Sequence, residues 1–291
     1  MSTVAVVAHA RKTFGGGLGQ LREVLAREGV TDPLWYEVKK SRRAPKRARQ
    51  AAAKGADLIF VWGGDGTVQR CLDAVAGTDA VVAILPAGTA NLLATNLHVP
   101  DDLTAAVQVG LHGNRRELDT GSVNGEHFAV MAGAGFDARM IAGADRAMKN
   151  RLGRAAYLYT AAGSLSAPRV KATVDVDGER FFKGRISLVL VANVGTIVGG
   201  VEAFTDAKPD DGLLELGVVT ARNPVDWGRV LGRAAIGSAQ RSPFVETTRG
   251  RSFRVKFDRK LPYELDGGIR PAARDLHIDV HPRSVTICVP A

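Results

Sequence analysis

Hydrophobic positions in the first third of the chain fall into short apolar runs separated by longer amphipathic stretches. Continuous apolar runs, typical of buried parallel strands, occur near residues 4–8, 57–62 and 80–85, and a further strand is expected near residues 34–38. The stretches near residues 18–28 and 44–54 have the spacing of helices. This alternation predicts an open α/β layer over residues 1 to about 118.

The pattern changes after Arg116, where short segments with β-type composition dominate. These segments cover residues 117–122, 127–131, 169–176, 180–194, 213–219 and 253–257. A single helical stretch, at about residues 138–165, interrupts them. The sequence therefore predicts a second domain, residues 119–279, built mainly of antiparallel sheet.

A glycine-rich loop follows the third apolar run, with the sequence Gly63, Gly64, Asp65, Gly66, Thr67. Glycines let the backbone approach a polyphosphate closely, and a helix that begins near Thr67 would add its positive N-terminal dipole. A carboxylate gains nothing from an anion, so Asp65 is expected to face a hydroxyl, a ribose or Mg²⁺. The alternative is a tight turn with Asp65 as an ordinary turn residue.

A second strand, loop and helix unit follows directly, at residues 80–94. Gly88 supplies a permissive backbone, while Thr89 and Asn91 place short polar groups at a helix start. Those two side chains either cap the helix or reach a ligand. Two such units in succession favour a phosphate-binding edge.

Together the two loops resemble the diacylglycerol kinase catalytic family of lipid kinases, whose relatives include sphingosine kinases and, more remotely, NAD kinases. The resemblance continues at residues 131–138, 192–200, 208–215 and 263–268. It implies a nucleotide-binding α/β domain to which residues 280–291 return, a lipid-binding β domain, ATP and Mg²⁺ as cofactors, and an acceptor that enters between the domains.

The resemblance also implies roles for individual residues. Nucleotide would be held by Gly63, Gly64, Gly66, Thr67, Gly88, Thr89 and Asn91. Asp65 would position the nucleotide or its metal, or serve as a base. Mg²⁺ would be bound by Asp211, aided by backbone carbonyls near Lys208 and Leu213.

The chain departs from the family pattern in two places. After the first strand, relatives carry Asn-Pro-x-Ser-Gly, whereas this chain offers the cations Arg11 and Lys12, which either bind phosphate or belong to a plain surface loop. The family's Asp-Gly-Glu glutamate, thought to be the general base, is replaced by Gly268. Asp266 is the nearer substitute, Glu264 is farther away, and Asp65 is another candidate.

Charge and composition add expectations about partners and location. Lys and Arg number 39 against 30 acidic residues, and eight basic residues without an acid lie between Lys39 and Lys54. A solvated helix face is the plain interpretation, but attraction to an anionic membrane suits a lipid enzyme better. Nucleic acid is not expected, because the run has no interleaved aromatic residues.

Nothing in the sequence suggests secretion or a membrane span. No apolar run is long enough to cross a bilayer, and the chain enters its first strand at once, which predicts a cytoplasmic protein peripheral to the membrane. Cys71 and Cys288 lie far apart, as expected for a reducing compartment.

The combined prediction is an ATP- and Mg²⁺-dependent kinase that phosphorylates a lipid hydroxyl such as that of diacylglycerol, with activity that the change at Gly268 could reduce. Two alternatives stay open: a catalytically silent member that binds lipid or nucleotide, and a kinase for a soluble acceptor such as NAD. A homodimer is left open as well.

Overall fold

The structure is a computed structural model that describes residues 3–135, 169–197, 201–234 and 237–291. Its contacts divide the chain into two compact units. Unit 1 contains residues 1–120 and 282–291, and unit 2 contains residues 121–281. The boundaries expected from the sequence, 118/119 and 279/280, lie within two residues of these.

Unit 1 is built on a parallel sheet, as the apolar runs predict. Its strands β1 (Val4–His9), β2 (Leu34–Val38), β3 (Leu58–Gly63) and β4 (Val81–Pro86) lie in the order β2-β1-β3-β4. The end of β16 (Gly268–Val289) adds a parallel strand beside β4, through Thr286 and Ile287. The expected return of the C-terminal segment to the first domain is therefore observed.

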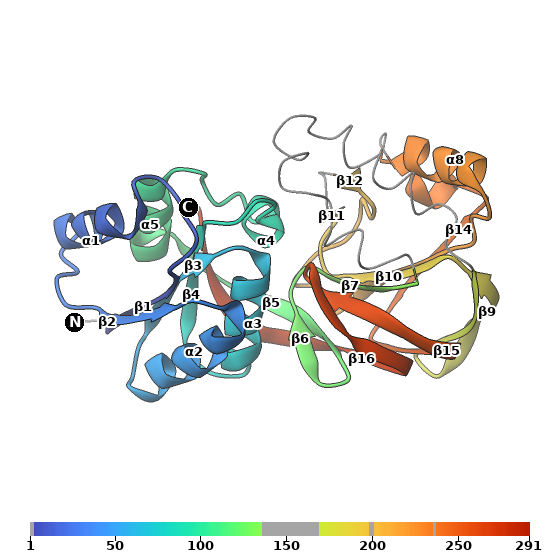
Figure 1. Cartoon of the computed structure of the whole chain (residues 1–291), viewed down its shortest axis with the longest axis horizontal. Coiled ribbons are helices and arrows are strands. Elements are labelled where there is room, and N and C mark those ends of the chain that lie inside the picture. Colours follow the sequence, from blue (N-terminus) through green and yellow to red (C-terminus); the bar gives the residue numbers. More distant parts are fainter. Residues whose placement is uncertain (1–2, 136–168, 198–200, 235–236) are drawn as a thin grey trace. The chain divides into compact units, whose positions relative to one another are not determined.

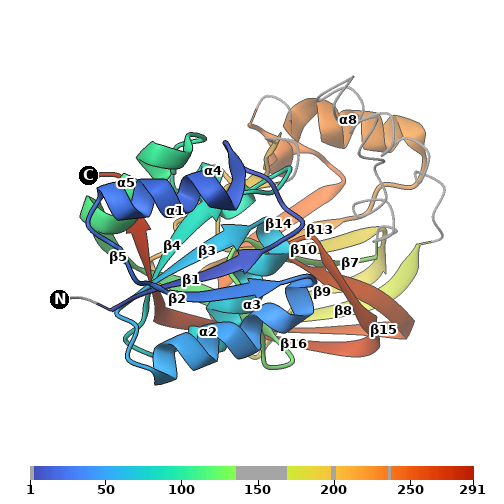
Figure 2. The ribbon, with the colours of Figure 1, turned by 60° about the vertical axis from the view of Figure 1, so that its left-hand side comes forward.

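Helices cover both faces of this sheet. Helices α1 (Gly17–Arg27) and α5 (Leu103–His112) lie on one face, and α2 (Ala44–Ala53) and α3 (Asp65–Val75) lie on the other (Figure 1, Figure 2). Strands covered on both faces must be apolar throughout, which explains why β1 and β3 are buried at every position. The α/β class predicted for this part of the chain is confirmed.

Unit 1 has three further elements, which connect these layers. They are the 3-10 turn η1 (Ser41–Arg43), the short helix α4 (Leu92–Asn96) and β5 (Asn114–Val123), whose last residues belong to unit 2.

Unit 2 is a mainly antiparallel β structure, as expected. Its main sheet has the order β14-β13-β10-β7-β15-β16, and β15 also pairs with β8, which pairs with β9. The strands are β6 (Glu126–Phe128), β7 (Met131–Ala134), β8 (Val170–Val176), β9 (Glu179–Ile186), β10 (Leu188–Ala192), β13 (Leu214–Val219), β14 (Val245–Gly250) and β15 (Ser252–Leu265), with the short pair β11 (Thr196–Ile197) and β12 (Val201–Glu202) and the 3-10 turn η3 (Ala239–Arg241). Alternate residues of these strands form one apolar core, which includes Phe253, Val255, Leu261 and Leu265.

Helix α8 (Pro224–Ala234), strand β14 and the part of β16 in this unit, residues 268–281, are among the elements that the sequence-based prediction lacks. Helix α8 buries Trp227 and Val230 against Val219 and Ala221. Strand β14 pairs with β13 along its whole length. The helical stretch expected at residues 138–165 lies outside the described residues.

Three hairpins in the described part of unit 2 use the same two-residue turn. Asn124-Gly125, Asp177-Gly178 and Asp266-Gly267 all have positive φ at both positions. This is the turn whose twist matches that of paired strands, and it favours Asn or Asp followed by Gly. The Asp266 segment is thus a hairpin turn, with Leu265 paired to Gly268.

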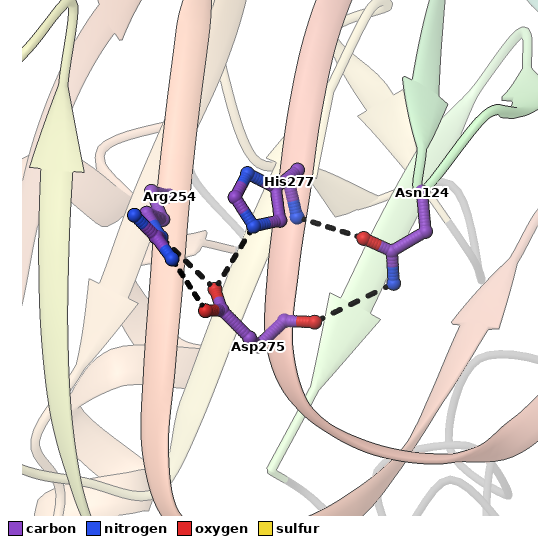
Figure 3. Close-up of polar contacts among 4 residues, drawn as sticks. All are labelled: Asn124, Arg254, Asp275 and His277. Carbon is purple, nitrogen blue, oxygen red and sulfur yellow. Dashed lines mark hydrogen bonds and ion pairs between the residues drawn. The ribbon is translucent and has the colours of Figure 1, made fainter.

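The first of these turns is fastened to the neighbouring strand by its asparagine (Figure 3). Asn124 Oδ1 accepts a hydrogen bond from the backbone N–H of His277 at 3.0 Å, and Asn124 Nδ2 donates to the Asp275 carbonyl at 3.4 Å. On the same surface Arg254 and Asp275 form an ion pair at 2.8 Å. These contacts join β15, β16 and the β5–β6 turn.

Candidate active site

The first glycine loop of unit 1 is close-packed at two glycines and open at the third. A Cβ on Gly63 would lie 2.5 Å from the Cβ of Thr67, and one on Gly64 would lie 2.9 Å from the Cα of Gly88. Gly66 differs, since a Cβ there would meet nothing within 4 Å. There is therefore free space beside Gly66, which is half-buried at the start of α3, where an anion gains from the helix dipole.

The two glycine loops touch backbone to backbone. A Cβ on Gly88 would lie 2.4 Å from the Cα of Gly64, so neither position accepts a side chain without moving a loop. The sequence predicts that both loops belong to one phosphate-binding edge, and in the structure the two loops are in contact at Gly64 and Gly88.

Asp65 ties the same two loops together. Its carboxylate accepts hydrogen bonds from the backbone N–H of Asn91 at 3.0 Å and of Leu92 at 2.5 Å. Burial raises the pKa of Asp65, while these amides and the charge of Lys12 act in the opposite direction. A carboxylate has about four lone-pair sites, so Asp65 can hold the second loop and still accept a bond from a ligand.

Asn91 shapes the second loop from within. Its backbone has φ +48°, its Oδ1 accepts from Gly88 N–H at 2.8 Å, and its Nδ2 donates to the Pro86 carbonyl at 3.0 Å. Its side chain makes no capping bond to α4. Thr89 is exposed at the tip of this loop. The geometry thus gives Asn91 an organising role and leaves Thr89 facing outward.

Thr67 lies beneath the loops. It is 2% exposed, and its Oγ1 lies 2.9 Å from Ser41 Oγ. Its methyl and hydroxyl groups fill the space that requires glycine at position 63. These contacts favour a supporting role for Thr67 over direct nucleotide contact.

The loop after β1 brings cations to the same region of unit 1. The Lys12 carbonyl accepts a hydrogen bond from Trp62 Nε1 at 3.1 Å, while the side chain of Arg11 is exposed. A pocket of about 490 Å³ adjoins this loop; it is lined by Thr13, Phe14, Gly15, Gly16, Gly88 and Leu103, among others. Gly88 thus belongs both to the paired glycine loops and to a pocket with room for part of a nucleotide.

The expected metal loop lines a second pocket, in unit 2, of about 630 Å³. Its lining includes Asp206, Lys208, Asp211, Glu215 and Arg249. The pKa of Glu215 is raised by burial and by the charges of Asp211 and Asp206, against the effect of Arg249. This pocket therefore gathers three carboxylates together with the two basic side chains of Lys208 and Arg249.

These donors suit Mg²⁺ in kind. Magnesium is bound by one or two carboxylates with water completing the shell, and the loop supplies carboxylate and carbonyl oxygens. One Asp211 oxygen already accepts the Leu213 N–H at 3.0 Å. Within the described ranges no three or more His, Cys, Asp or Glu side chains converge as a metal site. The loop therefore offers oxygen donors of the kind that Mg²⁺ prefers, and magnesium binding by Asp211 stays a prediction.

Asp266 is held inside the hairpin turn of β15 and β16. Its carboxylate accepts hydrogen bonds from the backbone N–H groups of Ala129, Val130 and Met131 at 2.8–2.9 Å. The residue is 3% exposed. Its oxygens are committed to backbone, and this geometry favours a structural role over that of the proton acceptor suggested by the sequence.

Glu264 is the carboxylate whose environment the sequence did not reveal. It is 2% exposed, and burial, with the nearby charge of Asp266, raises its pKa to about 7. Alternation along β15 could have shown that its side chain faces away from that of Leu265. Only the structure shows that this face is buried at Glu264.

Paired glycine loops at the carboxyl ends of parallel strands, joined here by the Asp65 carboxylate, are typical of nucleotide-binding α/β folds. Comparison with known proteins identifies the protein family. Residues 10–123 match the diacylglycerol kinase catalytic domain, and residues 130–289 match the YegS C-terminal NAD kinase beta sandwich-like domain. The chain belongs to the diacylglycerol kinase catalytic family, as the resemblance of its motifs predicted.

Individual relatives agree with this assignment. The chain is 28% identical to a diacylglycerol kinase of Bacillus subtilis (strain 168) over 77% of its own length and 75% of the relative's. It is 27% identical to a diacylglycerol kinase of Staphylococcus epidermidis over 84% and 79% of the two chains.

Solved structures support the fold alone. A crystal structure of a diacylglycerol kinase from Bacillus anthracis str. Sterne matches with a TM-score of 0.81, at 22% identity, over 99% of this chain and 97% of that chain. An NAD kinase from Archaeoglobus fulgidus in complex with ATP matches with a TM-score of 0.55, at 12% identity, over 98% and 93%. The NAD kinase likeness is therefore distant.

Proposed function

We propose that the protein transfers the γ-phosphoryl group of ATP to the hydroxyl of a membrane lipid such as diacylglycerol. A kinase is supported at the level of family by the matched domains and by relatives named diacylglycerol kinase. The single observation that best supports nucleotide binding is the backbone contact between Gly64 and Gly88. Through this contact the two loops would form one anion-binding surface.

The chain's own groups account for nucleotide binding. Backbone N–H groups at the start of α3 and the charges of Arg11 and Lys12 would neutralise the phosphates, while the adjoining pocket at Phe14 and Gly88 would hold another part of the nucleotide. Mg²⁺ would neutralise charge on the phosphates, and Asp211 with nearby carbonyls would bind a further ion. Phosphoryl transfer depends chiefly on such positioning and charge stabilisation.

The basic run supports a membrane-bound acceptor. Arg42, Arg43, Lys46 and Arg49 are exposed around α2, while Ala44, Ala48 and Ala51 are buried beneath them. Each basic residue near an anionic bilayer contributes about 1 kcal/mol of attraction. None of the helices in the described residues is long and apolar enough to cross a bilayer, so we propose peripheral attachment through this face.

The decisive experiment is transfer of the γ-phosphate of ATP to a panel of extracted lipids, with NAD as the comparison acceptor. Phosphorylation of a lipid with a free hydroxyl, and not of NAD, is the expected result. Binding of Mg·ATP without transfer to any acceptor would instead identify a silent nucleotide-binding member. Transfer to NAD alone would reassign the acceptor.

A further inference from the structure

Glu264 is a buried acid on the face of the unit 2 sheet opposite its apolar core. Its chain neighbours Tyr263 and Leu265 belong to that core, so the side chain of Glu264 projects the other way. In the sheet it lies between Gly133 of β7 and Ile269 of β16. The residue sits four positions before Gly268, in the strand that leads into the same hairpin.

Neither carboxyl oxygen of Glu264 has a hydrogen-bond partner among the described residues. Such groups are rare, because a buried polar atom without a partner loses its hydration and gains nothing in return. Asp266, two residues on, shows the usual arrangement, with three backbone donors on its oxygens. The contrast calls for a role for Glu264 other than holding the fold.

The ionisation of Glu264 is set by burial and by one neighbouring charge. Burial is the larger cause of its raised pKa, about 7, and the charge of Asp266 is the second. The adjacent positions on β7 and β16, Gly133 and Ile269, carry no charge. A carboxyl poised near neutrality is suited to accept a proton and release it again.

The positions beside Glu264 in the row across the sheet are apolar. Leu190, Gly133, Glu264 and Ile269 follow one another across four strands. Gly133 contributes no side chain, and a Cβ there would make only ordinary contacts, the nearest with Leu190 at 3.5 Å. Ile269 is 43% exposed, one of two large hydrophobic residues exposed to this degree in the described structure. An apolar acceptor fits this row better than a charged one.

We infer that Glu264 is the general base of the reaction, taking the role that Gly268 cannot fill. The inference rests on the proposed lipid kinase function. The acceptor hydroxyl gives its proton to the Glu264 carboxylate as its oxygen bonds to the γ-phosphorus of ATP. The bond from that phosphorus to the β,γ-bridging oxygen breaks, its electron pair leaves with ADP, and Glu264 then returns the proton to solvent.

The other carboxylates suggested by the sequence are already engaged. Asp266 is held by the amides of residues 129–131, and Asp65 by the amides of Asn91 and Leu92. Removing either would break backbone contacts as well as any chemistry. Glu264 has no such contacts to lose, which makes its replacement by glutamine a clean test.

The experiment measures lipid phosphorylation by the full-length chain and by Glu264→Gln from pH 5 to pH 9. We expect kcat of Glu264→Gln to fall by about 10² to 10⁴ fold, the usual worth of a general base. The KM for Mg·ATP should stay within about threefold. In the parent, kcat should rise with pH through a pKa near 7, and this rise should be absent from the variant. The exposed Glu179→Gln, on β9, is the matched control and should behave as the parent.

A second-site rescue tests the role independently. Gly268 does not have positive φ, but a Cβ there would lie 2.6 Å from Nη1 of Arg270, whose buried guanidinium is held by Glu126 and by the Gly268 carbonyl. Glutamate at this position requires Arg270 to shift, so thermal unfolding must first show that the double variant is folded. In a folded double variant, Gly268→Glu should raise kcat at least tenfold above that of Glu264→Gln alone. Glu264→Asp, which keeps a carboxylate, should retain the pH dependence at a lower rate if Glu264→Gln does not fold.

The outcomes separate this inference from the function on which it rests. Parent activity that survives Glu264→Gln with an unchanged pH profile would overturn the role of Glu264 and leave the lipid kinase standing. If Glu264→Gln loses activity and also loses Mg·ATP binding and thermal stability, the role of Glu264 is structural. That result would also overturn the inference. A parent that binds Mg·ATP and phosphorylates no lipid would overturn both.

Discussion

The Asp65 carboxylate lies 2.5 Å from the backbone nitrogen of Leu92, and through this contact the first glycine loop of unit 1 holds the second. The same carboxylate also accepts the Asn91 N–H. A residue that the sequence presented as a ligand of nucleotide or metal is thereby also a structural tie between loops.

Asp65→Ala tests this tie. The change leaves the N–H groups of Asn91 and Leu92 without their acceptor, and we expect a loss of about 1–3 kcal/mol in the free energy of unfolding. The affinity for Mg·ATP should fall as well, because the loops lose their mutual position. Urea unfolding and calorimetric titration measure the two effects. The exposed Asp79→Ala serves as control, and equal midpoints for Asp65→Ala and Asp79→Ala would contradict the tie.

Gly66 provides the sharpest test of phosphate binding. Gly64→Val is unsuitable, because its Cβ would meet the Cα of Gly88 at 2.9 Å and disturb both loops. At Gly66 a Cβ has free space, so Gly66→Ala should change the unfolding free energy by less than about 1 kcal/mol. If phosphate occupies that space, the Kd for Mg·ATP should rise at least about tenfold, a change of about 1.4 kcal/mol.

The control for Gly66→Ala is Gly19→Ala in α1, where a Cβ also meets nothing within 4 Å. It should leave the Kd for Mg·ATP unchanged. Equal nucleotide affinity in both variants would show that the backbone at Gly66 does not face the phosphates.

The basic face of α2 predicts salt-sensitive membrane binding. Replacement of Arg42, Arg43, Lys46 and Arg49 by glutamine should lower binding to anionic vesicles by at least about tenfold and flatten its dependence on salt. Arg47 is left in place because it is half-buried, with its Nη1 donating to Gln50 at 2.8 Å. Turnover of a soluble short-chain substrate should be nearly unchanged.

A matched charge change on unit 2 completes the membrane test. It replaces the exposed residues Arg251, Lys256, Arg259 and Lys260 by glutamine. Equal loss of vesicle binding in both quadruple variants would point to net charge alone. Unaltered vesicle binding in the α2 variant would show that the basic residues of this helix face solvent and do not bind the membrane.

Asp266→Ala should destabilise the hairpin of β15 and β16. Three buried N–H groups lose their acceptor, at about 1–3 kcal/mol each, so the free energy of unfolding should drop by at least about 3 kcal/mol. Asp266→Asn keeps the turn conformation and one acceptor oxygen, so its loss should be smaller. Guanidinium unfolding measures both, with the exposed Asp258→Ala of the same strand as control. A loss no larger than that of Asp258→Ala would remove the structural role.

The ion pair of Arg254 and Asp275 predicts a small acid-sensitive contribution to stability (Figure 3). The hydrogen bond from Arg254 lowers the pKa of Asp275 below its ordinary value. A lowered carboxyl pKa stabilises the folded state above the unfolded pKa, near 4, and this stabilisation is lost as the pH falls through the folded pKa. The difference in Tm between the parent and Asp275→Asn should therefore be present at pH 7 and absent at pH 2. A difference that is unchanged at acid pH would exclude the ion pair as its cause.

The sequence by itself determined the strands and most of the helices of unit 1, without α5, and it determined the family. Strands covered by helices on both faces must be apolar at every position, so β1, β3 and β4 were visible as continuous runs, and the loops that follow them carried recognisable motifs. In unit 2 the signal was weaker, because one short amphipathic helix resembles a loop when its partner surface is unknown. Helix α8 was missed for that reason: Trp227 becomes a core residue only against Val219.

Tertiary structure decided which polar residues hold the fold and which are available for chemistry. Hydrogen bonds between distant segments commit Asp266 to residues 129–131 and Asp65 to the amides of Asn91 and Leu92, and a sequence does not contain those distances. The same holds for Glu264, which is unremarkable in an alternating strand. Its burial beside Gly133, without a hydrogen-bond partner in the described structure, arises only when β7 and β16 are placed on either side of β15.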